Sequence, residues 1–123
     1  NAKRFRQENL EFNCLDIAAD PIPAGDIVIL RQVLQHLSNS EVNSILKKLV
    51  DFKYLILTEH IPEGSFIPNK DIISGQGTRL KKQSGLDITA PPFDFKYIEK
   101  NTLLKVLPED HPGIIETCVF KIQ

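Results

Sequence analysis

Two short apolar runs in this sequence are each followed at once by polar side chains that can do chemistry. Residues 26–30 read Asp-Ile-Val-Ile-Leu, and residues 54–58 read Tyr-Leu-Ile-Leu-Thr. The polar side chains that come after them are Arg31, Gln32, His36, Glu59 and His60. Apolar runs of this length are typical of buried parallel strands in an α/β fold. Because such folds bind ligands at the carboxyl ends of their strands, we expect these side chains at one edge of a sheet.

Each of these groups has a chemical and a structural interpretation. A histidine can act as a general base near neutral pH, but the Leu-Gln-His-Leu context of His36 favours packing or capping. Arg31 can bind a carboxylate through two hydrogen bonds, or it can form a salt bridge at the sheet edge. Glu59 and His60 either bind a substrate or form a solvated corner. The catalytic group is therefore unknown, and His36 is the only candidate for it.

A helix is predicted directly after the first strand. Ser38 and Glu41 match a capping box, in which a hydroxyl and a carboxylate bind free amide groups at a helix start. Apolar residues then recur at helical spacing up to Val50. We expect one amphipathic helix here.

Three further strands are predicted. Residues 10–15 alternate apolar and polar side chains and end at Asp16, and they predict a short strand. Residues 102–106 and 114–122 are separated by a segment with two prolines and a glycine, which indicates an antiparallel hairpin.

Residues 61–95 form a long segment rich in Pro, Gly, Ser, Asn and Asp. Connections of this length are usually functional loops or lids. Asn69 and Asp71 are suited to organise turns in it. Phe93 follows two prolines and predicts an extended segment with an anchoring aromatic ring, which can also form the wall of a substrate pocket.

Two patterns resemble a known family. The segment from Asp26 to Ser38 resembles the fourth conserved motif of class I S-adenosylmethionine-dependent methyltransferases. Asn69, Asp71, Gly75, Arg79 and the Pro-Pro-Phe segment ending at Phe93 resemble the signature of an uncharacterised methyltransferase subfamily.

The resemblance implies an α/β fold, namely a Rossmann-like, mostly parallel seven-stranded sheet with an antiparallel terminal hairpin, in which the last strand lies antiparallel beside the fifth. On this mapping residues 1–123 are one domain, the C-terminal portion of a methyltransferase, and residues 10–15 are the third strand. The runs at 26–30 and 54–58 are the fourth and fifth strands, and the hairpin supplies the sixth and seventh. The N-terminal strands and the glycine-rich turn that binds the cofactor are expected to be missing, so these residues alone are expected to bind the cofactor weakly or not at all.

The resemblance also implies S-adenosylmethionine as cofactor and a small molecule as methyl acceptor. Residues implied to bind the cofactor are Asp16, Ile17, Arg31 and Gln32, with Asp16 accepting a hydrogen bond from the adenine amino group; the alternative for Asp16 is capping of a turn. Residues implied to bind the acceptor are Glu59, His60, Asn69, Asp71, Arg79 and Phe93. Methyl transfer requires little of side chains, because the sulfonium is already activated and the protein aligns the reactants and excludes water.

Charge, residue spacing and cysteine content bear on which classes of protein this sequence can belong to. A net charge of −1 and a pI near 6.3 give no indication of nucleic-acid binding. No metal-ligand spacing is present, and no run approaches the ~18 apolar residues of a membrane span. Cys14 and Cys118 lie in apolar runs, which predicts two buried thiols in a reducing, cytoplasmic environment.

Two alternatives to a methyltransferase remain open. The chain can be a non-catalytic, methyltransferase-like binding or scaffold module, or a different nucleotide-binding α/β protein.

The sequence also predicts self-association. Since strands that lack a neighbour tend to pair with other chains, a homodimer through the exposed edge of residues 26–30 is expected.

Overall fold

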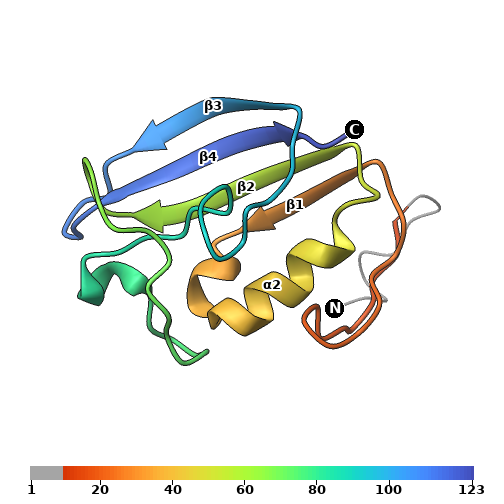
Figure 1. Cartoon of the computed structure of the whole chain (residues 1–123), viewed down its shortest axis with the longest axis horizontal. Coiled ribbons are helices and arrows are strands. Elements are labelled where there is room, and N and C mark those ends of the chain that lie inside the picture. Colours follow the sequence, from red (N-terminus) through yellow and green to blue (C-terminus); the bar gives the residue numbers. More distant parts are fainter. Residues whose placement is uncertain (1–9) are drawn as a thin grey trace.

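The computed structural model describes residues 10–123, which form a single sheet with one helix packed on it (Figure 1). The four strands are β1 (Ile27–Arg31), β2 (Tyr54–Ile61), β3 (Glu99–Val106) and β4 (Ile114–Lys121). The helices are the 3-10 turn η1 (Leu34–His36), the α-helix α2 (Asn39–Lys48) and the 3-10 turn η2 (Arg79–Lys82). The predicted hairpin is confirmed, with its first strand beginning three residues earlier than expected.

The strands lie in the order β1-β2-β4-β3. β1 and β2 are parallel, whereas β4 is antiparallel to both β2 and β3. The predicted α/β class is therefore confirmed, and the last strand lies antiparallel beside the strand that begins at Tyr54, as expected. The sheet of residues 10–123 is mixed rather than mostly parallel, because β4 lies between two strands that run the other way.

Helix α2 begins where the capping pattern predicts, but only one of the two bonds of the predicted capping box forms. The Glu41 carboxylate does not bind the Ser38 amide, because this amide donates to Ser74 Oγ at 2.7 Å and Glu41 Oε1 accepts from the Ser74 hydroxyl. The Ser38 hydroxyl accepts a hydrogen bond from the Glu41 amide at 3.3 Å, which satisfies one of the free donors of the first turn. Val42, Ile45 and Leu46 are buried against the sheet. The helix ends at Lys48, two residues before the predicted limit, and the chain turns through Leu49 into β2.

The core lies between the sheet and a layer made of α2 and residues 62–98. Leu55, Leu57, Cys118 and Phe120 point to this layer from β2 and β4. The long segment between β2 and β3 contains η2 but no α-helix, and it buries four apolar side chains in the core: Leu86, Ile88, Phe93 and Phe95. Packing of these side chains holds the loop on the sheet.

The other face of the sheet, which we call the open face, carries exposed apolar side chains. Ile27 and Ile29 of β1 are 55% and 66% exposed, and Leu104 of β3 is 57% exposed. No helix of residues 10–123 covers this face. β1 pairs with β2 alone among the described strands, so the other edge of β1 is unpaired.

The prediction of a strand at residues 10–15 is wrong. Leu10 forms an isolated bridge, and residues 11–16 have no regular structure and are exposed. Alternating side chains favour a strand only where a neighbouring strand pairs with the backbone, and the described sheet provides no such partner. Cys14 is consequently exposed, contrary to expectation, while Cys118 is buried as predicted.

Candidate functional site

The carboxyl ends of β1 and β2 lie side by side, as the sequence predicts, and we call this part of the sheet the carboxyl edge. Arg31 pairs with Thr58, and the Gln32 amide donates to the Thr58 carbonyl at 2.8 Å. Gln32 has a φ of 54°, a left-handed conformation that is uncommon for residues other than glycine. This conformation turns the chain abruptly from the sheet into η1.

Gln35, which the sequence analysis did not select, connects the elements at the carboxyl edge. Its amide donates to Glu59 Oε2 at 3.2 Å, and its side-chain Oε1 accepts from the His60 amide at 2.7 Å. Its carbonyl accepts from Arg79 Nη1 at 3.4 Å. The side chain is buried, and one residue therefore ties η1 to β2 and to the long loop.

Glu59 is a buried carboxyl group on the α2 side of β2, so the solvated corner given as its alternative role is wrong. The residue is 4% exposed, and its Oε1 has no hydrogen-bond partner among residues 10–123. Burial raises the pKa of Glu59 to about 8, although the Gln35 amide and the Arg79 charge act in the opposite direction. Burial thus favours the neutral, protonated carboxyl, and its Oε2 accepts from the Gln35 amide.

Arg79 is enclosed by backbone oxygens. It is 2% exposed, and Nη2 donates to the Leu37 carbonyl at 2.9 Å and to Asn39 Oδ1 at 2.6 Å. Burial lowers its pKa, while Asp71 and Glu59 raise it. Arg79 was predicted to bind the methyl acceptor. In the structure both of its Nη atoms hold η2 against the η1–α2 segment.

The other loop residues predicted to bind the methyl acceptor also bond to groups within the protein. Asn69 Nδ2 donates to the carbonyls of Asp87 and Pro91 at 2.8 and 2.9 Å, and Oδ1 accepts from the Asp87 amide. Asp71 Oδ1 accepts from the amides of Asn39 and Ile72, and the first of these bonds chiefly lowers the pKa of Asp71. Phe93 is part of the core.

The two histidines near the carboxyl edge bond to backbone carbonyls. His36 Nδ1 lies 3.1 Å from the Gly77 oxygen, and His60 Nε2 lies 2.7 Å from the Pro112 oxygen. Since a carbonyl only accepts, each ring donates through this nitrogen. His36 therefore orients the loop near Gly77, in agreement with its structural interpretation.

Asp16 and Ile17 lie at the opposite end of α2 from Arg31 and Gln32. Lys48, the last residue of α2, donates through Nζ to the Ile17 carbonyl at 2.8 Å. Asp16 Oδ1 accepts from the Ala18 amide at 3.0 Å, which is the turn-capping arrangement. Since ten helical residues span about 15 Å, the four predicted cofactor residues form two separate groups.

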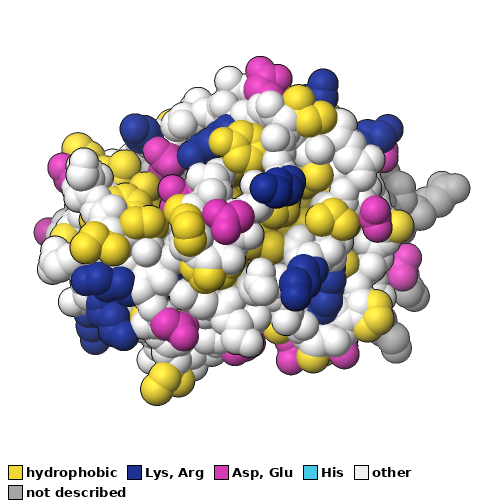
Figure 2. All heavy atoms as spheres, viewed as in Figure 1, with side chains coloured by type: hydrophobic (Ala, Val, Ile, Leu, Met, Phe, Trp, Pro, Cys, Tyr) yellow, Lys and Arg dark blue, Asp and Glu magenta, His cyan; other side chains and the backbone are white. Residues whose placement is uncertain are grey.

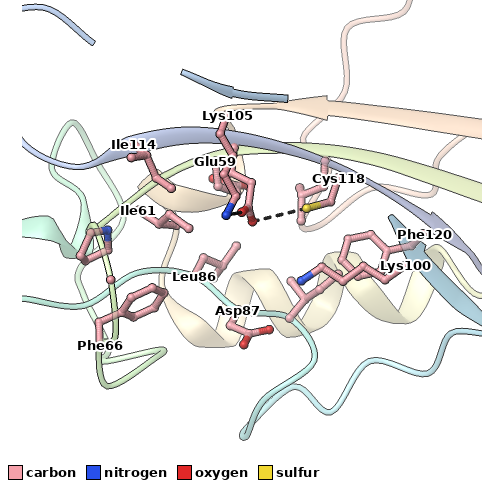
Figure 3. Close-up of a pocket in the computed structure, with 15 residues that line it drawn as sticks. Glu59, Ile61, Phe66, Leu86, Asp87, Lys100, Lys105, Ile114, Cys118 and Phe120 are labelled. Carbon is pink, nitrogen blue, oxygen red and sulfur yellow. Dashed lines mark hydrogen bonds and ion pairs between the residues drawn. The ribbon is translucent and has the colours of Figure 1, made fainter. Parts of the chain in front are cut away.

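A cavity of about 320 Å³ lies between the long loop and strands β2, β3 and β4. Figure 3 shows Glu59 and Lys105 on the strand side of it and Phe66, Leu86 and Asp87 opposite, on the loop. In Figure 2, which shows this face of the molecule, apolar side chains are visible between charged ones around a central hollow. Glu59 is the only predicted site residue that lines the cavity.

Charged side chains from the hairpin meet at the cavity. Lys105 Nζ lies 3.6 Å from Glu116 Oε2, and the Cys118 thiol donates to Glu116 Oε1 at 3.4 Å. Lys100 Nζ lies 5.6 Å from the centroid of the Phe120 ring, a cation–π distance. Sequence reasoning missed this group, although the period-two alternation of residues 114–120 was a signal for it.

Other kinds of site find no support in the part of the chain that the structure describes. Among residues 10–123 no group of three His, Cys, Asp or Glu side chains is arranged to hold a metal ion. Within the same range, no helix has the length and apolar character needed to cross a bilayer.

Comparison with protein-family models, curated proteins and solved structures found no match.

Proposed function

We propose that this chain takes part in methyl transfer from S-adenosylmethionine to a small-molecule acceptor. The observation that carries the proposal is the sheet order, in which β4 lies antiparallel between β2 and β3. The methyltransferase resemblance implies the same arrangement for the last strand and the fifth.

The carboxyl edge supplies the residues for this reaction. Arg31 and Gln32 leave β1 where open α/β sheets bind ligands, and the left-handed Gln32 directs the chain away from the sheet at this point. Strained residues of this kind concentrate at ligand sites. Arg31 is exposed and can orient the carboxylate of the cofactor's methionine part.

Asp16 and Ile17 have no part in this version of the site, since α2 separates them from Arg31. His60 is the acceptor-side group at the same edge, near the end of β2, whereas the buried Glu59 carboxyl points to the α2 side of the sheet. Catalysis by alignment suits this arrangement, because methyl transfer needs no paired acid and base.

Photocrosslinking with methyl-labelled S-adenosylmethionine tests the proposal. Ultraviolet irradiation is expected to label the peptide that contains Arg31 to His36. The variant Arg31→Ala should reduce labelling roughly tenfold to a hundredfold, the scale of one hydrogen bond to a charged group, while Lys53→Ala, at the amino end of β2, should leave it unchanged. Absent labelling, or labelling of another peptide that Arg31→Ala does not affect, would refute the proposal.

A binding module without catalysis is the second candidate. The cavity above β2 and β4 favours it, because this cavity is lined by residues that the methyltransferase resemblance does not assign, such as Lys105 and Glu116. Ligand binding in the cavity together with no S-adenosylmethionine labelling at the carboxyl edge would select this candidate.

A further inference from the structure

The cavity between the long loop and the strands is lined by both apolar and charged side chains. The apolar ones come from the sheet and from the loop, among them Leu57, Phe66, Leu86 and Phe120. An apolar cavity of about 150 Å³ holds benzene, so this cavity of about 320 Å³ has room for one ring together with a short polar substituent. The charged side chains decide which substituent fits.

A β-bulge in β3 brings two lysines to the cavity. Lys100 lies opposite Phe120 in the β3–β4 ladder, and Lys105 lies opposite Glu116. All four side chains line the cavity. Side chains five residues apart on a regular strand point to opposite faces of the sheet, but the register shifts at Leu103 and turns Lys105 to the same face as Lys100. Bulges often redirect side chains in this way beside functional sites.

Two acidic side chains at the cavity have partners within the protein. Glu116 Oε2 lies 3.6 Å from Lys105 Nζ, and its Oε1 accepts from the Cys118 thiol at 3.4 Å. Asp87 Oδ1 accepts from the Thr89 amide at 3.0 Å and from the Thr89 hydroxyl at 2.6 Å. An ion pair and hydrogen bonds therefore already stabilise both carboxylates.

Glu59 also lines the cavity, but it contributes no binding group there. Its Oε2 accepts from the Gln35 amide, and its Oε1 is buried rather than open to the cavity. Burial also favours the neutral acid. The side chain therefore adds neither a negative charge nor a reachable hydrogen-bonding group.

Lys100 is the charged side chain at the cavity that lacks a polar partner. Within residues 10–123 its Nζ makes no hydrogen bond or ion pair, and it lies 5.6 Å from the centroid of the Phe120 ring. Figure 3 shows Lys100 and Phe120 at one end of the cavity and Phe66 at the other. A ligand with one negative charge can pair with Lys100, whereas a second negative charge would face the carboxylates that line the same cavity.

We propose that the cavity is a binding site for a small organic anion with an apolar body and a single carboxylate, and that Lys100 Nζ donates a hydrogen bond to this carboxylate. The apolar body then lies against the side chains of the loop and the sheet, such as Phe66 and Leu86. The inference holds whether or not the chain takes part in methyl transfer, because nothing in it depends on Arg31 or Gln32.

Three ligands of similar size test the charge preference. 4-Fluorophenylacetate carries a carboxylate, 4-fluorophenylacetamide is its neutral counterpart, and 4-fluorophenethylammonium carries a positive charge. In fluorine-detected NMR titrations at low salt, we expect the carboxylate to bind roughly threefold to fivefold more tightly than the amide, the scale of one exposed ion pair. The ammonium ligand should bind most weakly. Sodium chloride at about 1 M should remove the preference, because salt screens exposed charges.

Several outcomes of these titrations would overturn the proposal. They are equal affinity of carboxylate and amide at low salt, tightest binding of the ammonium ligand, and no saturable binding of the carboxylate.

Variants locate the site independently. Lys100→Gln should abolish the preference for the carboxylate while retaining binding of the amide. The matched control Lys81→Gln, an exposed lysine of η2 that does not line the cavity, should leave the preference unchanged. Ile114→Trp should fill the cavity and prevent binding of both ligands, and Ile29→Trp, on the open face, should not.

A preference for the carboxylate that survives Lys100→Gln, or binding that survives Ile114→Trp, would contradict the proposal. Because Lys100 is exposed, its substitution should not prevent folding. If Ile114→Trp fails to fold, the two glutamine variants and the three ligands still decide between the outcomes.

Discussion

Glu59→Gln is expected to stabilise this protein, and by an amount that grows with pH. Burial raises the pKa of Glu59 from 4.5 to about 8 in the folded chain, so the folded state holds a proton that the unfolded state releases. Glutamine has nearly the same shape, is never ionised, and can still accept the bond from the Gln35 amide. The substitution therefore removes the pH-dependent cost of keeping this acid neutral or of burying its charge. The glutamine amide also brings one more N–H donor than the acid has, and that contribution is the same at every pH.

The sign follows from proton linkage. Below pH 4.5 Glu59 is protonated in both the folded and the unfolded chain, so its ionisation does not lower the free energy of unfolding. Between pH 4.5 and 8 Glu59 ionises in the unfolded chain but not in the folded one, and the free energy of unfolding falls as pH rises. One pKa unit corresponds to about 1.4 kcal/mol. The penalty relative to Gln is thus near zero at pH 4, about 3 kcal/mol at pH 7 and about 5 kcal/mol above pH 8.

Urea unfolding from pH 4 to 9 measures this difference directly. At each pH, the free energy of unfolding of the native protein is subtracted from that of Glu59→Gln. The contributions of all other titrating groups, which the two proteins share, cancel in this difference. Glu63→Gln, at an exposed position, is the matched control and should give a flat difference. A flat difference for Glu59→Gln as well, or one that decreases toward high pH, would show that Glu59 is not a buried neutral acid.

Three further substitutions test the loop contacts and the open face. Arg79→Lys should lower the free energy of unfolding in urea by roughly 2–3 kcal/mol, since an ammonium cannot reproduce the forked bonds to backbone oxygens; a loss no larger than that of exposed Lys81→Ala would contradict this. Asn69→Ala should cost about 2–3 kcal/mol by removing three hydrogen bonds within the loop, and should speed proteolysis between residues 62 and 98. Ile29→Lys should change stability by less than about 0.5 kcal/mol yet weaken self-association measured by light scattering. A native chain that is monomeric at high concentration would refute the expected homodimer.

Elements whose signals are local could be predicted from the sequence. The capping residues before α2 and the apolar runs of β1 and β2 carry their own patterns, and the structure places these elements as expected. Residues 10–15 carry a strand pattern too, but a strand also needs a neighbour that pairs with it, and no pattern within the segment reveals whether one exists.

The candidate site was harder to predict than the elements. Glu59 was selected because the predicted strand ended at Thr58, whereas β2 continues to Ile61 and contains Glu59. The meeting of the two strand ends follows from their parallel pairing. Gln35 was missed because its importance comes from three partners distant in sequence, Glu59, His60 and Arg79. The cavity depends on how the loop packs on β4, which composition alone does not determine.

The central claim, that the carboxyl edge binds S-adenosylmethionine, is tested most directly by an amide NMR titration of the labelled chain with this cofactor. Weak binding is expected, with the largest shift changes at Arg31, Gln32 and His36 and small ones at the far end of α2. S-adenosylhomocysteine should shift the same amides. No shift change at millimolar cofactor, or changes confined to residues near Asp16 or to the open face, would contradict the claim.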